Sequence, residues 1–135
     1  MSASTSIVTG VDFVSVPTAD LTRAMAFYGD VLGLPRSSTW QRSGEEPIAG
    51  EYETGTVTLA VLQSDRLGIP FAPVSVPIAL HVEDVEAARA ALTARGVEFV
   101  MDTIDSGVCH MAHFRDPDGN ALMLHHRYAP KHADG

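Results

Sequence analysis

Two stretches of the chain, about 64 residues apart, share one order of apolar and polar positions. Each begins with a short apolar run typical of a strand, passes an aspartate into an Ala-rich segment with helical spacing, and ends at a glycine. The aspartate and the glycine are Asp20 and Gly33 in the first stretch, and Asp84 and Gly96 in the second. Such a repeat predicts two copies of one module, packed as a single domain with a cleft between them.

The first copy predicts a strand, a helix and three further strands. The first strand is expected over 11–16, closed by Pro17, which lacks the amide donor that a ladder needs. A helix follows from Thr18 or Asp20, because apolar residues recur at spacings of three and four as far as Gly33. The remaining strands are expected over 35–42, 49–53 and 56–63, with a polar loop over 43–47.

The second copy predicts the same order of elements after a linker over 64–73. Its expected elements are a strand over 76–82, a helix over 84–95, a strand over 97–101, a loop over 102–107, and a hairpin of strands 109–115 and 120–126. The hairpin turn is Asp116-Pro117-Asp118-Gly119, in which proline sets φ at the second position and glycine tolerates the last one. If Arg115 pairs with Asn120, the residue numbers of any two residues that face each other across the hairpin sum to 235.

These elements place the chain in the α+β class, as two βαβββ modules that form a curved mixed sheet around a central cleft. We expect one domain over residues 1–135, with module one at about 7–63 and module two at about 74–128. A chain of 135 residues is long enough to bury roughly two thirds of its unfolded surface without disulfides.

Composition and charge narrow the partners and the compartment. The single cysteine, Cys109, excludes an intramolecular disulfide framework. A formal net charge of −8 with no basic stripe argues against nucleic acid as a partner. No apolar run approaches the length of a membrane span, and residues 1–6 lack the basic region of a secretory signal. We therefore expect a cytoplasmic protein that acts on neither membranes nor nucleic acids.

The paired modules, with their Asp-Leu and Asp-Val helix starts and the closing run Phe114-Arg115-Asp116-Pro117-Asp118-Gly119-Asn120, resemble the vicinal oxygen chelate superfamily. This group contains glyoxalase I, extradiol dioxygenases, fosfomycin-resistance enzymes and bleomycin-resistance proteins. The resemblance covers about 11–126 and implies the fold, whereas the activity stays open because this scaffold hosts isomerases, lyases, dioxygenases and drug-sequestering proteins.

The enzymes of this superfamily usually hold a divalent metal with a histidine on the first strand of a module and a glutamate on its last strand. Carried over to this chain, the histidine positions fall on Phe13 and Pro77, and the glutamate positions fall on Met123 and on Thr58 or Ala60. These side chains offer no imidazole or carboxylate, so we expect no metal cofactor at the usual positions.

A displaced set of histidines could replace the missing ligands. Alternation along the strands, together with the expected hairpin register, would bring His81, His110 and His125 to one wall of the cleft. Three converging imidazoles can hold zinc or iron, or one of them can act as an acid or base, but ordinary polar residues at the rim would look the same in sequence. His113, His126 and His132 are assigned no role.

The cleft is expected to be mostly apolar. Its candidate ligand-binding residues are Phe13, Trp40, Thr58, Ala79, His81, His110, Phe114, Met123 and His125. Such a wall suits an organic ligand better than a small phosphate.

Two hypotheses follow, and a third remains. The first is a metal-free binder that holds a small apolar or aromatic molecule in the cleft, as bleomycin-resistance-type proteins do. The alternative is a lyase, isomerase or dioxygenase that uses the histidines with or without a metal. The third is an interaction module with a vestigial cleft. We also expect a homodimer, because the exposed edge strand of each module invites pairing.

Overall fold

The computed structural model describes residues 6–131, and these form two four-stranded mixed sheets. One sheet has the strand order β1 (Phe13–Thr18), β4 (Thr58–Gln63), β3 (Ala49–Glu53), β2 (Arg36–Trp40), and the other has β5 (Ile78–His81), β8 (Ala121–Arg127), β7 (Cys109–Arg115), β6 (Ile104–Asp105). In each sheet the first and last strands of the module pair in parallel, and the other pairs are antiparallel. The predicted α+β class with two modules is confirmed.

Two capped helices begin where the aspartates predict. The helices are α1 (Leu21–Ala26), which continues as the π-helical turn η1 (Phe27–Val31), and α2 (Val85–Ala94), and a short 3-10 helix η2 (Ser64–Leu67) follows β4. The carboxylates of Asp20 and Asp84 accept the backbone N–H three residues later, at 3.2 and 3.0 Å. Such N-caps satisfy amide groups that have no partner inside the helix.

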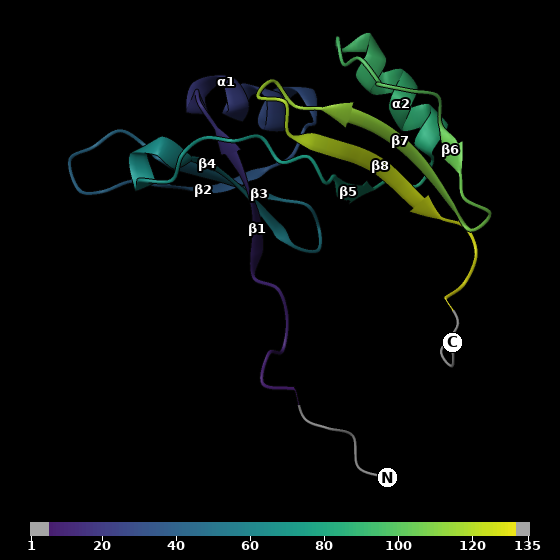
Figure 1. Cartoon of the computed structure of the whole chain (residues 1–135), viewed down its shortest axis with the longest axis horizontal. Coiled ribbons are helices and arrows are strands. Elements are labelled where there is room, and N and C mark those ends of the chain that lie inside the picture. Colours follow the sequence, from purple (N-terminus) through teal and green to yellow (C-terminus); the bar gives the residue numbers. More distant parts are fainter. Residues whose placement is uncertain (1–5, 132–135) are drawn as a thin grey trace.

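The two modules share one core. Figure 1 shows α1 and α2 on the same side of the sheets, and the buried side chains of that side form a single cluster. Alternate residues of β4 and β8 supply it, namely Leu59 and Val61 from the first module and Leu122 and Leu124 from the second. The apolar core is therefore continuous between the two modules.

A buried polar turn joins the modules. The Asn120 side chain, fully buried, donates from Nδ2 to the Pro17 carbonyl at 2.8 Å and accepts the Val74 amide at Oδ1 at 2.8 Å. The Tyr28 hydroxyl donates to Asp116 Oδ2 at 2.7 Å. Burial, followed by the negative charge of Asp116, raises the pKa of Tyr28 far above its ordinary value. We call Tyr28, Asp116 and Asn120, with the backbone groups that they bond, the polar lock.

Two of the predicted strands differ from the structure. Pro17 does not end β1, which runs to Thr18, because β1 is an edge strand with β4 as its single neighbour and can accommodate a residue without an N–H. The strand expected over 97–101 is replaced by an isolated bridge between Phe99 and Phe114. The Phe99 ring instead packs against Phe114 and under the Arg89 guanidinium, and the short strand β6 forms later, within the expected loop.

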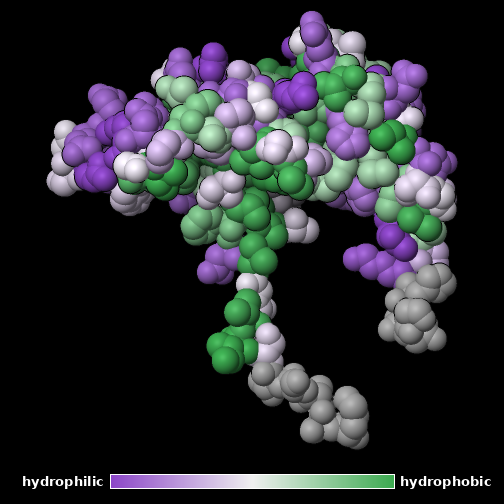
Figure 2. Space-filling view, in the orientation of Figure 1, coloured by the Kyte–Doolittle hydropathy of each residue, from purple (hydrophilic) through white to green (hydrophobic). Residues whose placement is uncertain are grey.

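The N-terminal segment before β1 is apolar and uncovered. Ile7 and Val8 are 99% and 71% exposed, and Val11 and Phe13 are 63% and 58% exposed. Figure 2 shows this hydrophobic segment projecting from the body of the molecule. No helix within residues 6–131 combines the length and the apolar character that crossing a bilayer requires.

Candidate functional site

A cavity of about 760 Å³ lies between the two modules. Its wall combines both halves of the chain: Val11, Val14, Leu32, Leu34, Thr54, Gly55, Thr56, Val57 and Leu59 from the first, and Ile78, Ala79, Leu80, His81, Val82, Ala88, Ala91, Leu92 and Leu124 from the second. Almost all of these side chains are aliphatic, so the cavity favours an apolar occupant.

In each module, the parallel pair formed by the first and last strands contributes to the cavity wall. Val14 of β1 is the register partner of Leu59 in β4, and Leu80 of β5 is the register partner of Leu124 in β8. These four side chains lie on the faces of the sheets that the helices cover. The cavity therefore lies at the junction of the modules, against the helix-covered faces of both sheets, and opens to solvent beside exposed residues such as Ala91.

Small residues on α2 leave the space open. Ala88 and Ala91 are three residues apart, so they lie on one face of the helix, and both line the cavity. Their methyl groups fill little of the volume between α2 and the segment that carries Leu32 and Leu34. Bulkier side chains at the two alanine positions would occupy the cavity.

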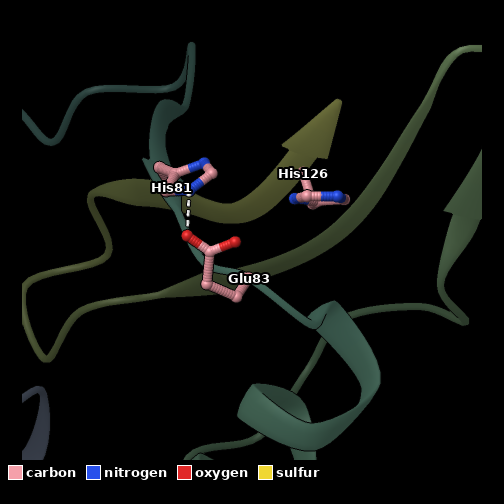
Figure 3. Close-up of side chains that lie close together, drawn as sticks. All are labelled: His81, Glu83 and His126. Atoms are coloured by element: carbon pink, nitrogen blue, oxygen red, sulfur yellow. Dashed lines mark hydrogen bonds and ion pairs between the residues drawn. The ribbon is translucent and has the colours of Figure 1, made fainter. Parts of the chain in front are cut away.

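One titratable side chain, His81, lines the cavity. Its Nε2 lies 3.3 Å from Glu83 Oε1, and the two side chains are 65% and 89% exposed. Figure 3 shows His126 beside this pair, and one ligand atom from each of the three residues falls within 4.8 Å of the other two. His81 thus joins the cavity wall to a small polar cluster with Glu83 and His126, which do not themselves line the wall.

The expected hairpin register is wrong by one residue. Arg115 pairs with Ala121, so opposed numbers sum to 236 rather than 235. Asn120 belongs to the turn: its carbonyl accepts the Asp116 amide at 3.0 Å, and its own amide donates to Asp116 Oδ1 at 2.9 Å. A shift by one residue moves every side chain of the strand to the opposite face.

The shift changes the roles of Phe114 and of the histidines. Phe114 is 1% exposed and packs in the core, so its assignment to the cleft wall is wrong. His110 pairs with His126 rather than with His125 and lies 3.5 Å from Asp105 Oδ2. His81 and His125 are register partners, in agreement with the expectation that they share one level, but the ring beside His81 is that of His126, with centroids 5.8 Å apart.

Asp105, whose carboxylate lies beside His110, accepts two further hydrogen bonds. The backbone amide of Gly107 donates to Asp105 Oδ1 at 2.9 Å, and the Tyr128 hydroxyl donates to the same oxygen at 2.7 Å. These hydrogen bonds, together with the nearby imidazole of His110, lower the pKa of Asp105. His110 therefore belongs to a group at the β6–β7 end and not to the cavity.

Most of the other predicted ligand-binding residues lie away from the cavity wall. Ala79 and His81 line it, whereas Phe13, Trp40, Thr58, Met123 and His125 are not part of the wall within the described residues. Phe13 pairs with Thr58, and Met123 pairs with Ala79. These residues alternate with core residues and so lie on the faces opposite to the helices, which the cavity reaches only at Ala79 and His81 of the edge strand β5. A role for those faces in ligand binding stays a prediction.

The roles of Glu83, His126 and the aliphatic wall could not be recognised from the sequence. Leu32, Leu80 and Leu124 carry the helical and strand periodicities of ordinary core residues, which gives no sign of an unfilled space beside them. His126 approaches His81 through the contact of β5 with β8, where its Nδ1 lies 3.1 Å from the Val82 oxygen. His132, which received no role, lies outside the described residues.

The positions at which related enzymes hold a metal do not fit an ion here. Phe13, Pro77 and Met123 offer a ring, a pyrrolidine and a thioether, and Thr58 donates its hydroxyl to Glu53 at 2.9 Å. Hard divalent ions require oxygen or imidazole donors. A hydrogen bond from the Ser37 hydroxyl, followed by that of Thr58, lowers the pKa of Glu53.

Solved structures share this fold. A member of the glyoxalase, bleomycin-resistance and dioxygenase superfamily from Sphaerobacter thermophilus DSM 20745 superposes with a TM-score of 0.75 at 22% identity, covering 87% of this chain and 97% of the other. The antibiotic-binding protein TnmS3 from Streptomyces sp. CB03234 gives 0.72 at 24% identity, with 89% and 97% covered. A lactoylglutathione lyase from Agrobacterium tumefaciens gives 0.68 at 17% identity, with 89% and 95% covered.

Comparison of sequences identifies the family. No curated protein sequence matches the chain. The family model of the Glyoxalase/Bleomycin resistance protein/Dioxygenase superfamily matches residues 10–124, a span that contains nearly every strand and helix described above. The chain therefore belongs to the Glyoxalase/Bleomycin resistance protein/Dioxygenase superfamily.

Proposed function

We propose that the protein binds a small apolar or aromatic molecule in the cavity between its modules, without a metal at the family's usual positions. The observation that carries this proposal is the cavity itself, about 760 Å³ in volume and walled by aliphatic side chains. Ligand sites of drug-sized molecules span roughly 300–1,000 Å³ and combine apolar walls with a few polar groups. His81, Thr54 and Thr56 supply such groups at this site.

The fold alone does not decide between binding and catalysis. One similar structure is named an antibiotic-binding protein and another a lactoylglutathione lyase. The chemistry of the wall favours binding, because aliphatic side chains desolvate a ligand but transfer no proton.

A thermal-shift screen tests the proposal. Purified protein is heated with a library of apolar and aromatic compounds, and hits are titrated by calorimetry. A ligand at about a hundred times its Kd should stabilise the native state by about 2.7 kcal/mol and raise Tm accordingly. Failure of every compound to raise Tm would contradict the proposal and favour an interaction module with a vestigial cleft.

Catalysis at the same cavity is the second candidate. The observation that favours it is the imidazole of His81 in a mostly aliphatic wall, where it could act as an acid or base. Mass spectrometry of a bound compound before and after incubation separates the candidates. A compound recovered unchanged supports binding, whereas conversion that is lost in His81→Ala supports an enzyme.

We also propose that the protein forms a homodimer through its N-terminal segment. Ile7 and Val8 expose apolar side chains that the single chain leaves uncovered. Light scattering should give twice the chain mass of 14.4 kDa, and a combined Ile7→Ser and Val8→Ser variant should shift the equilibrium towards monomer. Ile69→Ser, at a loop side chain that is 52% exposed, is the control. A monomeric wild type at micromolar concentration would refute the assembly.

A further inference from the structure

We propose that His81, Glu83 and His126 bind one divalent transition-metal ion at the edge of the cavity. Their ligand atoms lie within 4.8 Å of one another. Figure 3 shows the three side chains gathered where β5 ends beside β8. The site goes beyond the proposed binding function, and its residues differ from the family's usual metal positions at Phe13, Pro77 and Met123.

The backbone brings the three residues together. His81 ends β5, and Glu83 is two residues later, in the segment before the Asp84 cap of α2. The Val82 amide donates to the His125 carbonyl at 3.0 Å, which continues the contact with β8 beyond the last residue of β5. The rings of His81 and His126 are 5.8 Å apart between centroids, so they border the same space.

The donor set selects the class of ion. Two imidazoles and one carboxylate suit zinc, nickel or cobalt, whereas magnesium and calcium require oxygen ligands. Three protein ligands also leave at least one coordination position open, as in catalytic zinc sites.

The spacing of the donor atoms is close to that of a metal site. Ligands of a tetrahedral zinc ion are roughly 3.4 Å apart, given metal–nitrogen distances of about 2.1 Å. His81 Nε2 and Glu83 Oε1 already lie 3.3 Å apart. A separation of up to 4.8 Å has to close by about 1.4 Å, which the exposed side chains of His81 and Glu83 can accommodate by rotation towards the half-buried His126.

A backbone carbonyl orients the His126 ring. Nδ1 of His126 lies 3.1 Å from the Val82 oxygen. A carbonyl oxygen can only accept, so Nδ1 carries the proton in the neutral ring and Nε2 keeps the lone pair that an ion needs. Metal-bound histidines commonly use their second nitrogen in this way, as a donor to a carbonyl or a carboxylate.

The position of His81 connects the ion to the cavity. Because His81 also lines the apolar wall, an ion bound to it would lie at the edge of the ligand space. Its open coordination position could then accept an oxygen, nitrogen or sulfur atom from a cavity ligand.

Cobalt titration tests the site without any assay of activity. Chelator-treated protein is titrated with Co²⁺ and followed by visible absorption, with Zn²⁺ calorimetry in parallel. We expect one saturable equivalent per chain. The variants His81→Ala, Glu83→Gln and His126→Ala should each weaken binding by at least about tenfold, the scale on which metal sites respond to lost support.

Two further variants control the assignment. His113→Ala removes a histidine whose register partner is Met123, away from the proposed ligands, and should leave the affinity unchanged. His125→Ala removes the neighbour of His126 and should have little effect. Binding that is lost in His125→Ala but kept in His126→Ala would overturn the ligand set. The absence of saturable binding, or binding that survives the triple variant of His81, Glu83 and His126, would overturn the site, with Tm measured to show that each variant folds.

Discussion

Replacing Asn120 by alanine is expected to lower the free energy of unfolding by about 2 to 3 kcal/mol, since it leaves the polar groups around it without partners. The side chain, fully buried, donates to the Pro17 carbonyl and to Asp116 Oδ2 and accepts the Val74 amide, each at 2.8 Å. Pro17 and Val74 belong to different modules, so the substitution also loosens the junction between them. Urea unfolding followed by circular dichroism measures the change.

The control for Asn120→Ala is Asp102→Asn, a polar change at an exposed residue of the 102–103 loop. It should alter the free energy of unfolding by less than about 0.5 kcal/mol, as surface substitutions usually do. If Asn120→Ala were as stable as this control, the polar lock would not hold the modules together.

Replacing Ala91 by tryptophan is expected to weaken ligand binding by at least about tenfold, which corresponds to about 1.4 kcal/mol. Ala91 lines the cavity and is exposed, so an indole can extend into the ligand space without displacing core side chains. Titration of the strongest hit from the thermal-shift screen into wild type and variant measures the loss.

Ala90→Trp is the matched control for Ala91→Trp. Ala90 is the preceding residue of the same helix, is also exposed, and is absent from the cavity wall. Both variants add the same side chain to α2, so they should have similar effects on Tm. Equal affinity of the two variants for the ligand would mean that the ligand binds elsewhere.

The helix starts and stops could be predicted because they depend on local chemistry. Asp20 and Asp84 cap the helices through hydrogen bonds that span three residues. Gly33 and Gly96 adopt φ values of 75° and 93°, which other residues rarely reach. The repeated order of these signals was therefore sufficient to indicate two modules.

The hairpin register could not be predicted because it depends on distant groups. Asn120 appears in sequence as the first residue of a strand, but its side chain bonds to Pro17, about a hundred residues earlier in the chain. These tertiary bonds hold Asn120 in the turn, and the strand begins one residue later, at Ala121. The errors at Phe114 and His110 both follow from this one shift.

The location of the cavity could not be predicted from the sequence either. Alternation predicts which residues share a face of a sheet, and most of the residues predicted for the cleft lie on the face opposite to the helices. The unfilled space lies on the helix side, where Ala88 and Ala91 meet Leu32 and Leu34. Whether an apolar face is fully packed depends on the sizes of side chains from several elements, which no single pattern records.

The polar lock also determines how the molecule comes apart. The Tyr28 hydroxyl, from the first half of the chain, has its carboxylate partner in the second half, and both groups are buried. Separating the halves would place these groups in water and open the shared core at the same moment. We therefore expect the two halves to unfold together, with neither half folding as an independent fragment.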